Sequence, residues 1–368
     1  MISNKPKIAV IGLKGLPAFG GAAAVGENII EQLKDEFDFT VYSIASHANK
    51  SKSEINQKVF KEFPIKKLNV IYYYFASVFH VLIVKSYDII HVHHTDMSFI
   101  LPFLRLKYKV IITSHGSAYK IKGINFKYNK LTTELLILSE KYFLRFANIV
   151  TCVSKELAHQ IEKRHSRQVY YIPNGMAVNT YPDSVLDKQK EEYILFAAGR
   201  IIPTKGCHVF LKAMKSNGLK IKTIVIGDME QHKKYTNEII HLAKGLNVEF
   251  LGLIKDKEIL YNYIRNAKLF IFPSSLEAMS MMLLEVAALR VPIISSSIIE
   301  NRDVFDDNEV LYFKTDDDED LENKIEYALD NSEIMIEKSN AAYEKLVNVF
   351  NWGKIGKEYE KLYRMLIK

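Results

Sequence analysis

Cysteine is scarce in this sequence, whose 368 residues include only Cys152 and Cys207. The two lie far apart and lack the spacing of metal ligands, so simple packing in a reducing compartment is favoured over a disulfide framework. A secretory signal is also missing, because the polar stretch 1–7 is followed by an apolar run, Ile8 to Ile11, that is too short for one. We therefore expect a cytoplasmic protein.

No uncharged apolar run reaches the ~20 residues that span a bilayer. The longest, Leu68 to Val84, has 17 residues and includes Asn69, Ser77 and His80. A strand-like segment, 88–93, follows it at once. We interpret the run as a short strand followed by a buried helix, with shallow membrane contact as the alternative.

Nucleotide-binding and nucleic-acid-binding signatures are incomplete or absent. There is no helix-turn-helix, RRM, zinc-finger or basic-helix pattern, so no nucleic-acid partner is expected. The glycine-rich stretch Gly12 to Gly21 follows an apolar strand but contains neither a Walker A loop nor a full G-x-G-x-x-G. Its glycines can let a backbone approach a ligand closely, and a plain tight turn is the alternative.

Two clusters of metal-ligating residue types have simpler explanations than a metal. Alternation along a strand places His91 and His93 on one face and His94 on the other, so at most two converge without a sharp turn. The acidic run 316–320 precedes an amphipathic helix from Leu321, where acids suit a helix start. We expect no bound metal.

The content of the chain indicates a two-domain α/β protein. With 48% hydrophobic and 11% aromatic residues, the chain can bury large cores and is long for one domain. Short apolar strands alternate with helices, which is typical of parallel sheets. The expected strands are 7–11, 39–43, 88–93, 109–113, 148–153 and 169–172, then 193–198, 221–227, 248–252, 269–272 and 310–313. A polar linker, 179–192, separates the two sets.

Charge is distributed unevenly between the halves. Residues 1–180 hold 24 Lys and Arg against 13 Asp and Glu, and residues 181–368 hold 26 against 30. The basic half suits anionic lipid or a lipid-linked pyrophosphate, and a generic basic surface is the alternative. Peripheral contact with the inner face of the membrane through this half therefore stays open.

Two glutamates, Glu277 and Glu285, flank an expected helix start after the strand 269–272. Ser280 is the expected N-cap, and the helix should run from Met281 to residue 289. Unpaired amides at a helix start attract anions. A phosphate flanked by two carboxylates that bind hydroxyls is what a nucleotide sugar needs, although an ordinary strand-helix unit with two surface glutamates is the alternative.

Two further sites follow expected strands. Arg200 and Lys205 stand at a strand-to-helix junction, where two cations can neutralise a departing nucleoside diphosphate without a metal, or else form a solvated basic loop. His115 closes the strand 109–113, and Gly116 opens the backbone beside it. A packed or solvated histidine is the alternative there.

These segments resemble the GT-B glycosyltransferases of retaining family 4, also called glycosyl transferases group 1. The resemblance rests on four motifs in the family's order: His115-Gly116 at a strand end, Ile172-Pro-Asn-Gly175, Gly199-Arg200 with Lys205-Gly206, and the E-x7-E pair Glu277 and Glu285. Ala278 departs from the family's usual glycine, and a Cβ at this position can reorient the donor, so the resemblance does not fix which sugar is used.

The resemblance implies the GT-B fold, with two Rossmann-like domains whose parallel sheets face one another across a cleft. The acceptor-binding domain would span 1–177 and be joined by a C-terminal helix, 355–368, and the nucleotide-sugar domain would span 178–354. It also implies a role for each site residue: Arg200, Lys205, Ser280 and Met281 at the diphosphate, Glu285 at the ribose, the backbone of Leu253 and Ile254 at the base, Glu277 and His115 in catalysis, and Gly20 and Gly21 in a loop near donor and acceptor. Separately, Tyr119, Lys120 and Lys122 lie near His115 in the sequence and are candidates for contact with the acceptor.

The activity implied is transfer of a sugar, with retention, from a nucleoside diphosphate donor to a glycan or lipid-linked acceptor in the synthesis of a cell-surface polysaccharide or glycoconjugate. A UDP-sugar is favoured, and neither a cofactor nor a metal is needed. Two alternatives stay open: a catalytically silent protein that binds sugar nucleotides or glycans, and an epimerase of UDP-sugars.

Overall fold

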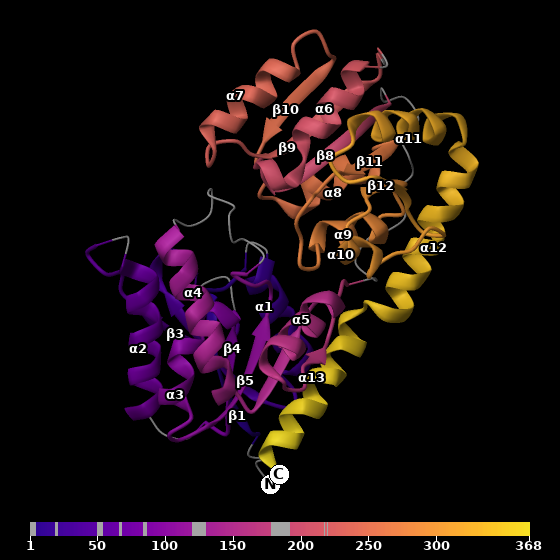
Figure 1. Ribbon diagram of the computed structural model, residues 1–368. Helices are drawn as coiled ribbons and strands as arrows, with labels where there is room; N and C mark the ends of the chain where they lie inside the picture. The colour runs from indigo at the N-terminus through magenta and orange to yellow at the C-terminus, as the bar shows by residue number, and fades with distance from the viewer. Residues whose placement is uncertain are drawn as a thin grey trace. The chain divides into compact units, whose positions relative to one another are not determined.

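The chain forms two compact units, each a parallel sheet covered by helices (Figure 1). The computed structural model describes residues 5–18, 21–49, 54–65, 68–83, 87–119, 130–177, 192–216, 218 and 220–368. The first unit comprises residues 1–174 and 352–368, and the second comprises residues 175–351. The C-terminal segment therefore belongs to the first unit.

The first unit contains a seven-stranded sheet in the order β3-β2-β1-β4-β5-β6-β7, and every neighbouring pair is parallel. Its strands are β1 (Lys7–Lys14), β2 (Asp38–Ile44), β3 (Gln57–Phe60), β4 (Ile89–His93), β5 (Lys109–Ser114), β6 (Ile149–Cys152) and β7 (Tyr170–Tyr171). The order reverses direction at β1, which is the point where open sheets of this kind form crevices at their carboxyl edge.

The helices of the first unit form two layers. Right-handed crossovers place helices that follow β1 on one face of the sheet and helices that follow β3 to β6 on the other. Helix α13 packs against α1 on the first face. The elements are α1 (Gly21–Leu33), η1 (Ala45–His47), α2 (Asn69–Ile83), η4 (Thr95–Ile100), α3 (Leu101–Leu104), α4 (Lys130–Phe143), η5 (Leu144–Phe146), α5 (Lys155–His165) and α13 (Trp352–Ile367).

The second unit contains a six-stranded parallel sheet in the order β10-β9-β8-β11-β12-β13. Its strands are β8 (Tyr193–Arg200), β9 (Lys222–Asp228), β10 (Val248–Gly252), β11 (Leu269–Phe272), β12 (Ile293–Ser296) and β13 (Leu311–Phe313). Its helices are η6 (Pro203–Lys205), α6 (Cys207–Ser216), α7 (Lys233–Leu242), α8 (Lys257–Arg265), α9 (Met281–Ala288), α10 (Ile299–Arg302), α11 (Asp318–Asp330) and α12 (Ser332–Val349).

The central strands are hydrophobic on both faces because helices cover both. Residues 8–13 of β1, 89–93 of β4 and 269–272 of β11 are all buried. Such continuous apolar runs are typical of parallel sheets and account for the strands that the sequence predicted. Each unit has its own core of buried side chains from its strands and helices.

The apolar run 68–84 differs from its interpretation as a short strand and a buried helix. The strand lies earlier, at β3, and α2 occupies residues 69–83. This helix is buried on one side only, since Phe79 is 67% exposed and Ile83 is 63% exposed. No helix among the described residues is long and apolar enough to cross a membrane.

Glycine is required at the carboxyl end of β1. Gly12 has φ +114, and a Cβ at this position would lie 2.4 Å from the carbonyl oxygen of His93. The backbones of β1 and β4 therefore approach closely where both strands end. A Tyr73 hydroxyl on α2 accepts the Gly12 N–H at 2.8 Å and fixes this end of the strand.

We expect Gly12→Ala to lower the free energy of unfolding of the first unit by about 2 to 4 kcal/mol, through the clash and the strained φ together. Gly21→Ala is the matched control, because Gly21 has φ +59 but open space around its Cβ, and it should cost only ~1 kcal/mol. Urea unfolding followed by the fluorescence of Trp352, the single tryptophan, reports on this unit. Equal losses in the two variants would contradict the close approach.

Candidate active site

The carboxyl edge of the second sheet is shaped by a close approach between two loops. Gly206, which ends the η6 turn, has φ +73, and a Cβ there would lie 2.0 Å from the carbonyl oxygen of Pro273. The Ser275 N–H donates to the Thr204 carbonyl at 2.9 Å. The loop after β8 is thus pressed against the loop after β11, which places Lys205 beside the residues that precede α9.

Lys205 and Glu277 form an ion pair at this edge. The Lys205 Nζ lies 2.5 Å from Glu277 Oε1, and the Ser274 hydroxyl donates to the same oxygen at 2.7 Å. The glutamate side chain is only 10% exposed. Lys205, expected at the diphosphate, therefore contacts Glu277, expected at the sugar, directly.

The start of α9 lies next to this ion pair in sequence. Ser280 occupies the N-cap position with extended backbone, as predicted, but its side chain makes no capping hydrogen bond. The first N–H groups of a helix have no partner within the helix. The amides near Ser280 and Met281 therefore keep the capacity to bind an anion.

Glu285 is the second carboxylate, and it lies on α9 with 5% of its surface exposed. Its Oε1 accepts hydrogen bonds from the Lys257 ammonium and from the Tyr261 hydroxyl, the latter at 3.2 Å. Both partners lie on α8, so the buried glutamate links α9 to α8. Sequence reasoning missed Lys257 and Tyr261, although their spacing of four on a helix that Asp256 caps is visible in the sequence.

The remaining residues assigned to the donor lie at the same edge of the sheet. Arg200 ends β8 and is exposed, while Leu253 and Ile254 follow β10 and are partly exposed. Because all strands of the sheet are parallel, their carboxyl ends share this edge, which is where α/β sheets bind ligands. Among the residues expected to bind the donor, Lys205 and Glu277 contact one another directly, through their ion pair.

In the first unit, His115 follows β5 and contacts other histidines. Its Nε2 lies 2.8 Å from Nδ1 of His93, with one of the two nitrogens donating to the other, and the rings are stacked. His93 stacks in turn on His91, with ring centroids 4.3 Å apart. The expectation that His94 lies on the opposite face is corrected by a sharp turn at φ +83, which brings its ring to 5.5 Å from that of His115.

The innermost histidine connects this cluster to the C-terminal helix. His91 Nδ1 lies 2.7 Å from the Tyr363 hydroxyl of α13, and its Nε2 lies 2.7 Å from the Thr113 hydroxyl. Burial lowers the pKa of His91 to about 3. Burial, followed by repulsion from neighbouring imidazoles, also holds the pKa of His93 and of His115 well below the usual value. All three rings are therefore neutral at pH 7.

The structure describes only some of the residues expected near the donor and the acceptor. Gly21 begins α1, at the carboxyl side of β1. Gly20, Lys120 and Lys122 lie outside the described residues.

The acidic run 316–320 has the role that its sequence predicted. Asp317 is the N-cap of α11, and its side chain accepts the Asp320 N–H at 3.0 Å. Chiefly this hydrogen bond lowers the pKa of Asp317. Across the part of the chain that the structure describes, no three His, Cys, Asp or Glu side chains are arranged to hold a metal ion.

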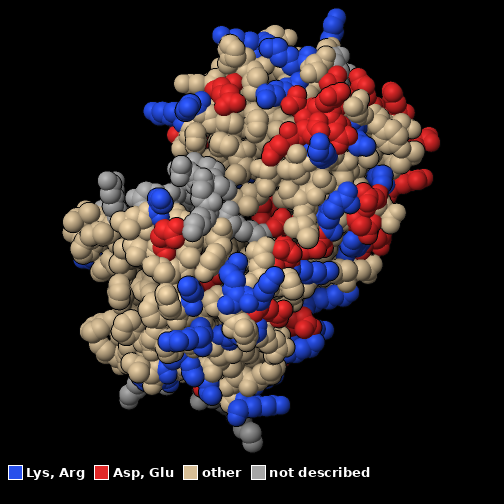
Figure 2. Space-filling model, in the orientation of Figure 1, with Lys and Arg blue, Asp and Glu red and all other residues tan. Residues whose placement is uncertain are grey.

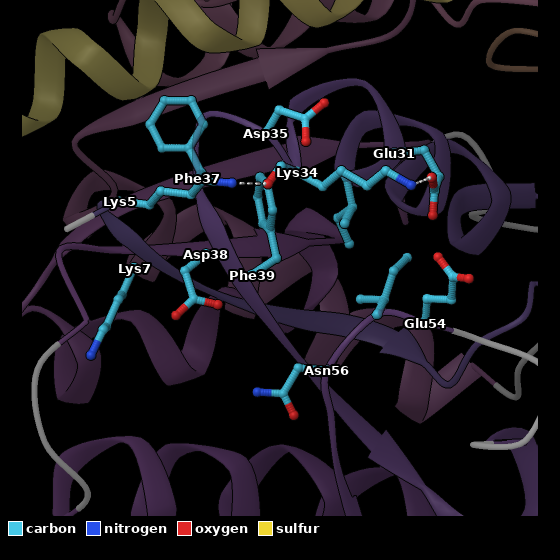
Figure 3. Close-up of a pocket in the computed structure, with 12 residues that line it drawn as sticks. Lys5, Lys7, Glu31, Lys34, Asp35, Phe37, Asp38, Phe39, Glu54 and Asn56 are labelled. Atoms are coloured by element: carbon cyan, nitrogen blue, oxygen red, sulfur yellow. Dashed lines mark hydrogen bonds and ion pairs between the residues drawn. The ribbon is translucent and has the colours of Figure 1, made fainter. Parts of the chain in front are cut away.

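A cavity in the first unit lies away from these groups (Figure 3). Lys7 and Asp38, the first residues of β1 and β2, line it, so it opens at the amino edge of the sheet. Lys34 pairs with Glu31 at 2.7 Å, and the Lys5 ammonium donates to the Lys34 carbonyl at 3.0 Å. The cavity is therefore at the wrong edge for the ligand of a parallel sheet.

Comparisons with known proteins agree with this architecture. Residues 19–179 match the family model "Glycosyltransferase Family 4", and residues 183–345 match "Glycosyl transferases group 1". The capsular polysaccharide biosynthesis glycosyltransferase CapM of Staphylococcus aureus is 23% identical over 273 residues, which cover 68% of this chain and 70% of CapM. Other curated relatives match over as little as 40% of their own length.

Two solved structures share the fold over nearly the whole chain. Sucrose-phosphate synthase from Thermosynechococcus elongatus has a TM-score of 0.81 at 19% identity and covers 98% of this chain and 99% of its own. Anabaena HepE in complex with UDP has a TM-score of 0.79 at 17% identity, with 98% and 100% covered. Two Rossmann-like units with parallel sheets define the GT-B class of protein. This chain belongs to the family 4 glycosyltransferases, with a C-terminal half of the group 1 type.

The buried histidines predict a pH dependence of stability in the first unit. A ring that stays neutral when folded takes up a proton near pH 6.5 when unfolded. This stability is therefore complete above pH 6.5 and is lost as pH falls toward the folded value, which is about 3 for His91. In His91→Gln, the slope of unfolding free energy against pH between about 6 and 5 should decrease by up to about 1.4 kcal/mol per pH unit.

Urea unfolding followed by Trp352 fluorescence at several pH values measures this slope. His159→Gln, at an exposed histidine of α5, is the control and should leave the slope unchanged. A His91→Gln protein with the wild-type slope would show that His91 ionises alike in the folded and unfolded chain.

Proposed function

We propose that this protein is a retaining glycosyltransferase that moves a sugar from a nucleoside diphosphate donor, with UDP-sugars favoured, to a glycan or lipid-linked acceptor. One observation carries the proposal: two nearly buried carboxylates, each held by a lysine, flank a helix start that lacks a side-chain cap. A donor of this class offers a diphosphate for the helix start and hydroxyls for the carboxylates.

Lys205 can bind a diphosphate without releasing Glu277. A lysine ammonium has three N–H donors, and one serves the glutamate at 2.5 Å. The other two can reach phosphate oxygens, together with Arg200 and the amides near Ser280 and Met281. As the bond between sugar and phosphate breaks, negative charge grows on the diphosphate, and these preorganised donors stabilise it.

The carboxylates would then select the rest of the donor. Glu285 keeps Oε2 for the ribose hydroxyls while Oε1 is held by Lys257 and Tyr261. Glu277 would accept a hydrogen bond from a hydroxyl of the sugar. The backbone of Leu253 and Ile254, two partly exposed residues, would pair with the base. These roles divide one ligand over the ends of β8, β10 and β11.

His115 would act at the reacting face of the sugar. Its lowered pKa, caused first by burial, leaves it a neutral hydrogen-bonding group. The contact with His93 Nδ1 fixes the orientation of its ring. We assign it to the reaction and not to nucleotide binding, because the proposed nucleotide contacts all lie in the second unit.

The acceptor class is inferred from two observations. The first half of the chain is basic, which suits an anionic or pyrophosphate-linked acceptor. The relative CapM is described as an enzyme of capsular polysaccharide biosynthesis. Synthesis of a cell-surface polysaccharide or glycoconjugate at the cytoplasmic side of a membrane fits both.

Turnover assays separate this proposal from its alternatives. Purified protein would be incubated with a panel of nucleotide sugars, with and without a lipid-linked acceptor, while nucleotide release and product are followed. We expect release that depends on the acceptor and a product that keeps the anomeric configuration. A silent binding protein would release no nucleotide, and an epimerase would convert the free nucleotide sugar without an acceptor.

Removing the charge of Glu285 should weaken nucleotide binding. We expect Glu285→Gln to raise the dissociation constant of UDP by a factor of roughly 10 to 100, corresponding to about 1.5 to 3 kcal/mol for hydrogen bonds to a charged group. Titration calorimetry with UDP measures it. Glu249→Gln is the matched control, since Glu249 is also paired with a lysine, Lys222, at 3.0 Å in the same unit.

His115→Ala should reduce turnover and leave UDP affinity nearly unchanged. Turnover should fall by about 10² or more while UDP affinity stays within about twofold of wild type. A variant that remains active, or that loses UDP affinity as Glu285→Gln does, would refute the assignment of His115 to the reacting face.

Activity should survive chelation. Because Arg200, Lys205 and a helix start would supply the positive charge at the diphosphate, we expect turnover to stay within about twofold of its starting value after dialysis against EDTA. Complete loss that magnesium or manganese restores would contradict this mechanism.

A further inference from the structure

Helix α2 has an outer side that nothing in the described first unit covers. The helix contains no charged residue, and its inner side packs into the core through Tyr73, Tyr74 and Val78. On the outer side, Ile71, Phe75, Phe79 and Ile83 recur every four residues and are 49% to 67% exposed. A solvent-facing helix side is normally polar, so this composition requires a reason.

The exposed apolar surface continues over the neighbouring helices. α2, α3 and α4 follow β3, β4 and β5 and lie in the same helix layer of the first unit. η4 contacts both α2 and α4. The rings of Phe75 and Phe99 lie 5.7 Å apart and join α2 to η4. We call the following exposed residues the apolar face: Ile65, Leu68, Val70, Ile71, Phe75, Phe79, Ile83, Phe103, Leu106, Leu131, Leu135, Leu138 and Tyr142. Figure 2 shows this side as a largely tan area with blue side chains and one red patch at its border.

The exposed charges beside the apolar face are mostly basic. Arg105, Lys107 and Lys109 are exposed after α3, and Lys141 is exposed on α4, with its Nζ 5.3 Å from the centre of the Tyr142 ring. Of the acidic residues nearby, Glu62 is exposed close to Ile65 in the sequence, Asp96 and Glu134 are partly exposed, and Glu140 is completely buried. Apolar side chains bordered by lysine, arginine and aromatic rings are the composition of a membrane-surface helix.

We propose that the apolar face docks the protein onto an anionic lipid bilayer, with α2 lying in the plane of the interface. Phe75, Phe79 and Ile83 enter the acyl boundary, and the bordering cations contact lipid phosphates. At 15 residues, α2 extends ~22 Å and lies on the bilayer without crossing it. This inference stands whether or not the proposed reaction is correct.

Charge favours a bilayer over a second copy of the chain. In a twofold dimer the same surface faces itself, so the cations after α3 and on α4, which outnumber the one exposed carboxylate nearby, Glu62, would approach like charges. A bilayer that contains anionic lipid supplies both the apolar interior and the opposite charge. The occupant that matches both properties is therefore lipid.

Vesicle binding by the full chain tests the proposal. Vesicles of phosphatidylcholine alone, and with about 30% phosphatidylglycerol, would be sedimented with wild type and variants. We expect wild type to bind the anionic vesicles and Phe79→Ser/Ile83→Ser to bind them about 10-fold more weakly or worse. Lys107→Gln/Lys141→Gln should reduce binding to anionic vesicles by several fold and leave binding to phosphatidylcholine unchanged.

Ile334→Ser/Ile336→Ser is the matched control, because these isoleucines of α12 are 40% and 53% exposed outside the apolar face. It should bind as wild type does. Leu131→Ser/Leu135→Ser on α4 gives a second, independent disruption, and unchanged unfolding midpoints show that each variant is folded. Three results would overturn the proposal: wild type that binds neither vesicle, α2 and α4 variants that bind as the control does, or light scattering that shows a wild-type dimer converted to a monomer by Phe79→Ser/Ile83→Ser.

Discussion

The proposed donor site depends on the close approach of the Gly206 turn to the Pro273 carbonyl. No side chain fits between these two backbones, since a Cβ would lie 2.0 Å from the oxygen. This contact sets the loop after β8 against the loop after β11 and holds Lys205 at Glu277. Because the strands are parallel, it does so at the edge where a helix start also opens. The close approach at Gly206 therefore brings the Lys205 ammonium and the Glu277 carboxylate to the edge of the sheet where α9 begins.

In the first unit, neutral histidine side chains, and not ion pairs, hold the proposed catalytic residue His115 in place. His115 is held by His93, which stacks on His91, which is bound by Tyr363 of the C-terminal helix. The last helix of the chain thus reaches the strand end at which His115 stands, through a buried network. Burial keeps the rings uncharged, so they can orient a group at the reacting face without opposing a cationic transition state. The first unit also carries the apolar face.

Much of the fold could be predicted from the sequence, because continuous apolar strands and helix breakers are local signals. The helix start at Ser280 and the acidic cap at Asp317 follow from residue type and spacing. The ion pairs could not be predicted, since Lys205 lies 72 residues from Glu277 and their contact depends on sheet order. For the same reason the turn at His94 could not be predicted, and the sequence of the run that forms α2 leaves a buried helix and shallow membrane contact as alternatives. Periodicity shows that a helix has an apolar side but not whether another element covers it.

The most direct test of the account is a structure determined with UDP bound. The account predicts phosphates within hydrogen-bond distance of Lys205 and the amides at the start of α9, with the ribose at Glu285. No metal ion should bridge the phosphates. UDP bound at the cavity beside Lys34 in the first unit, or held through a metal at the acidic run before α11, would contradict it.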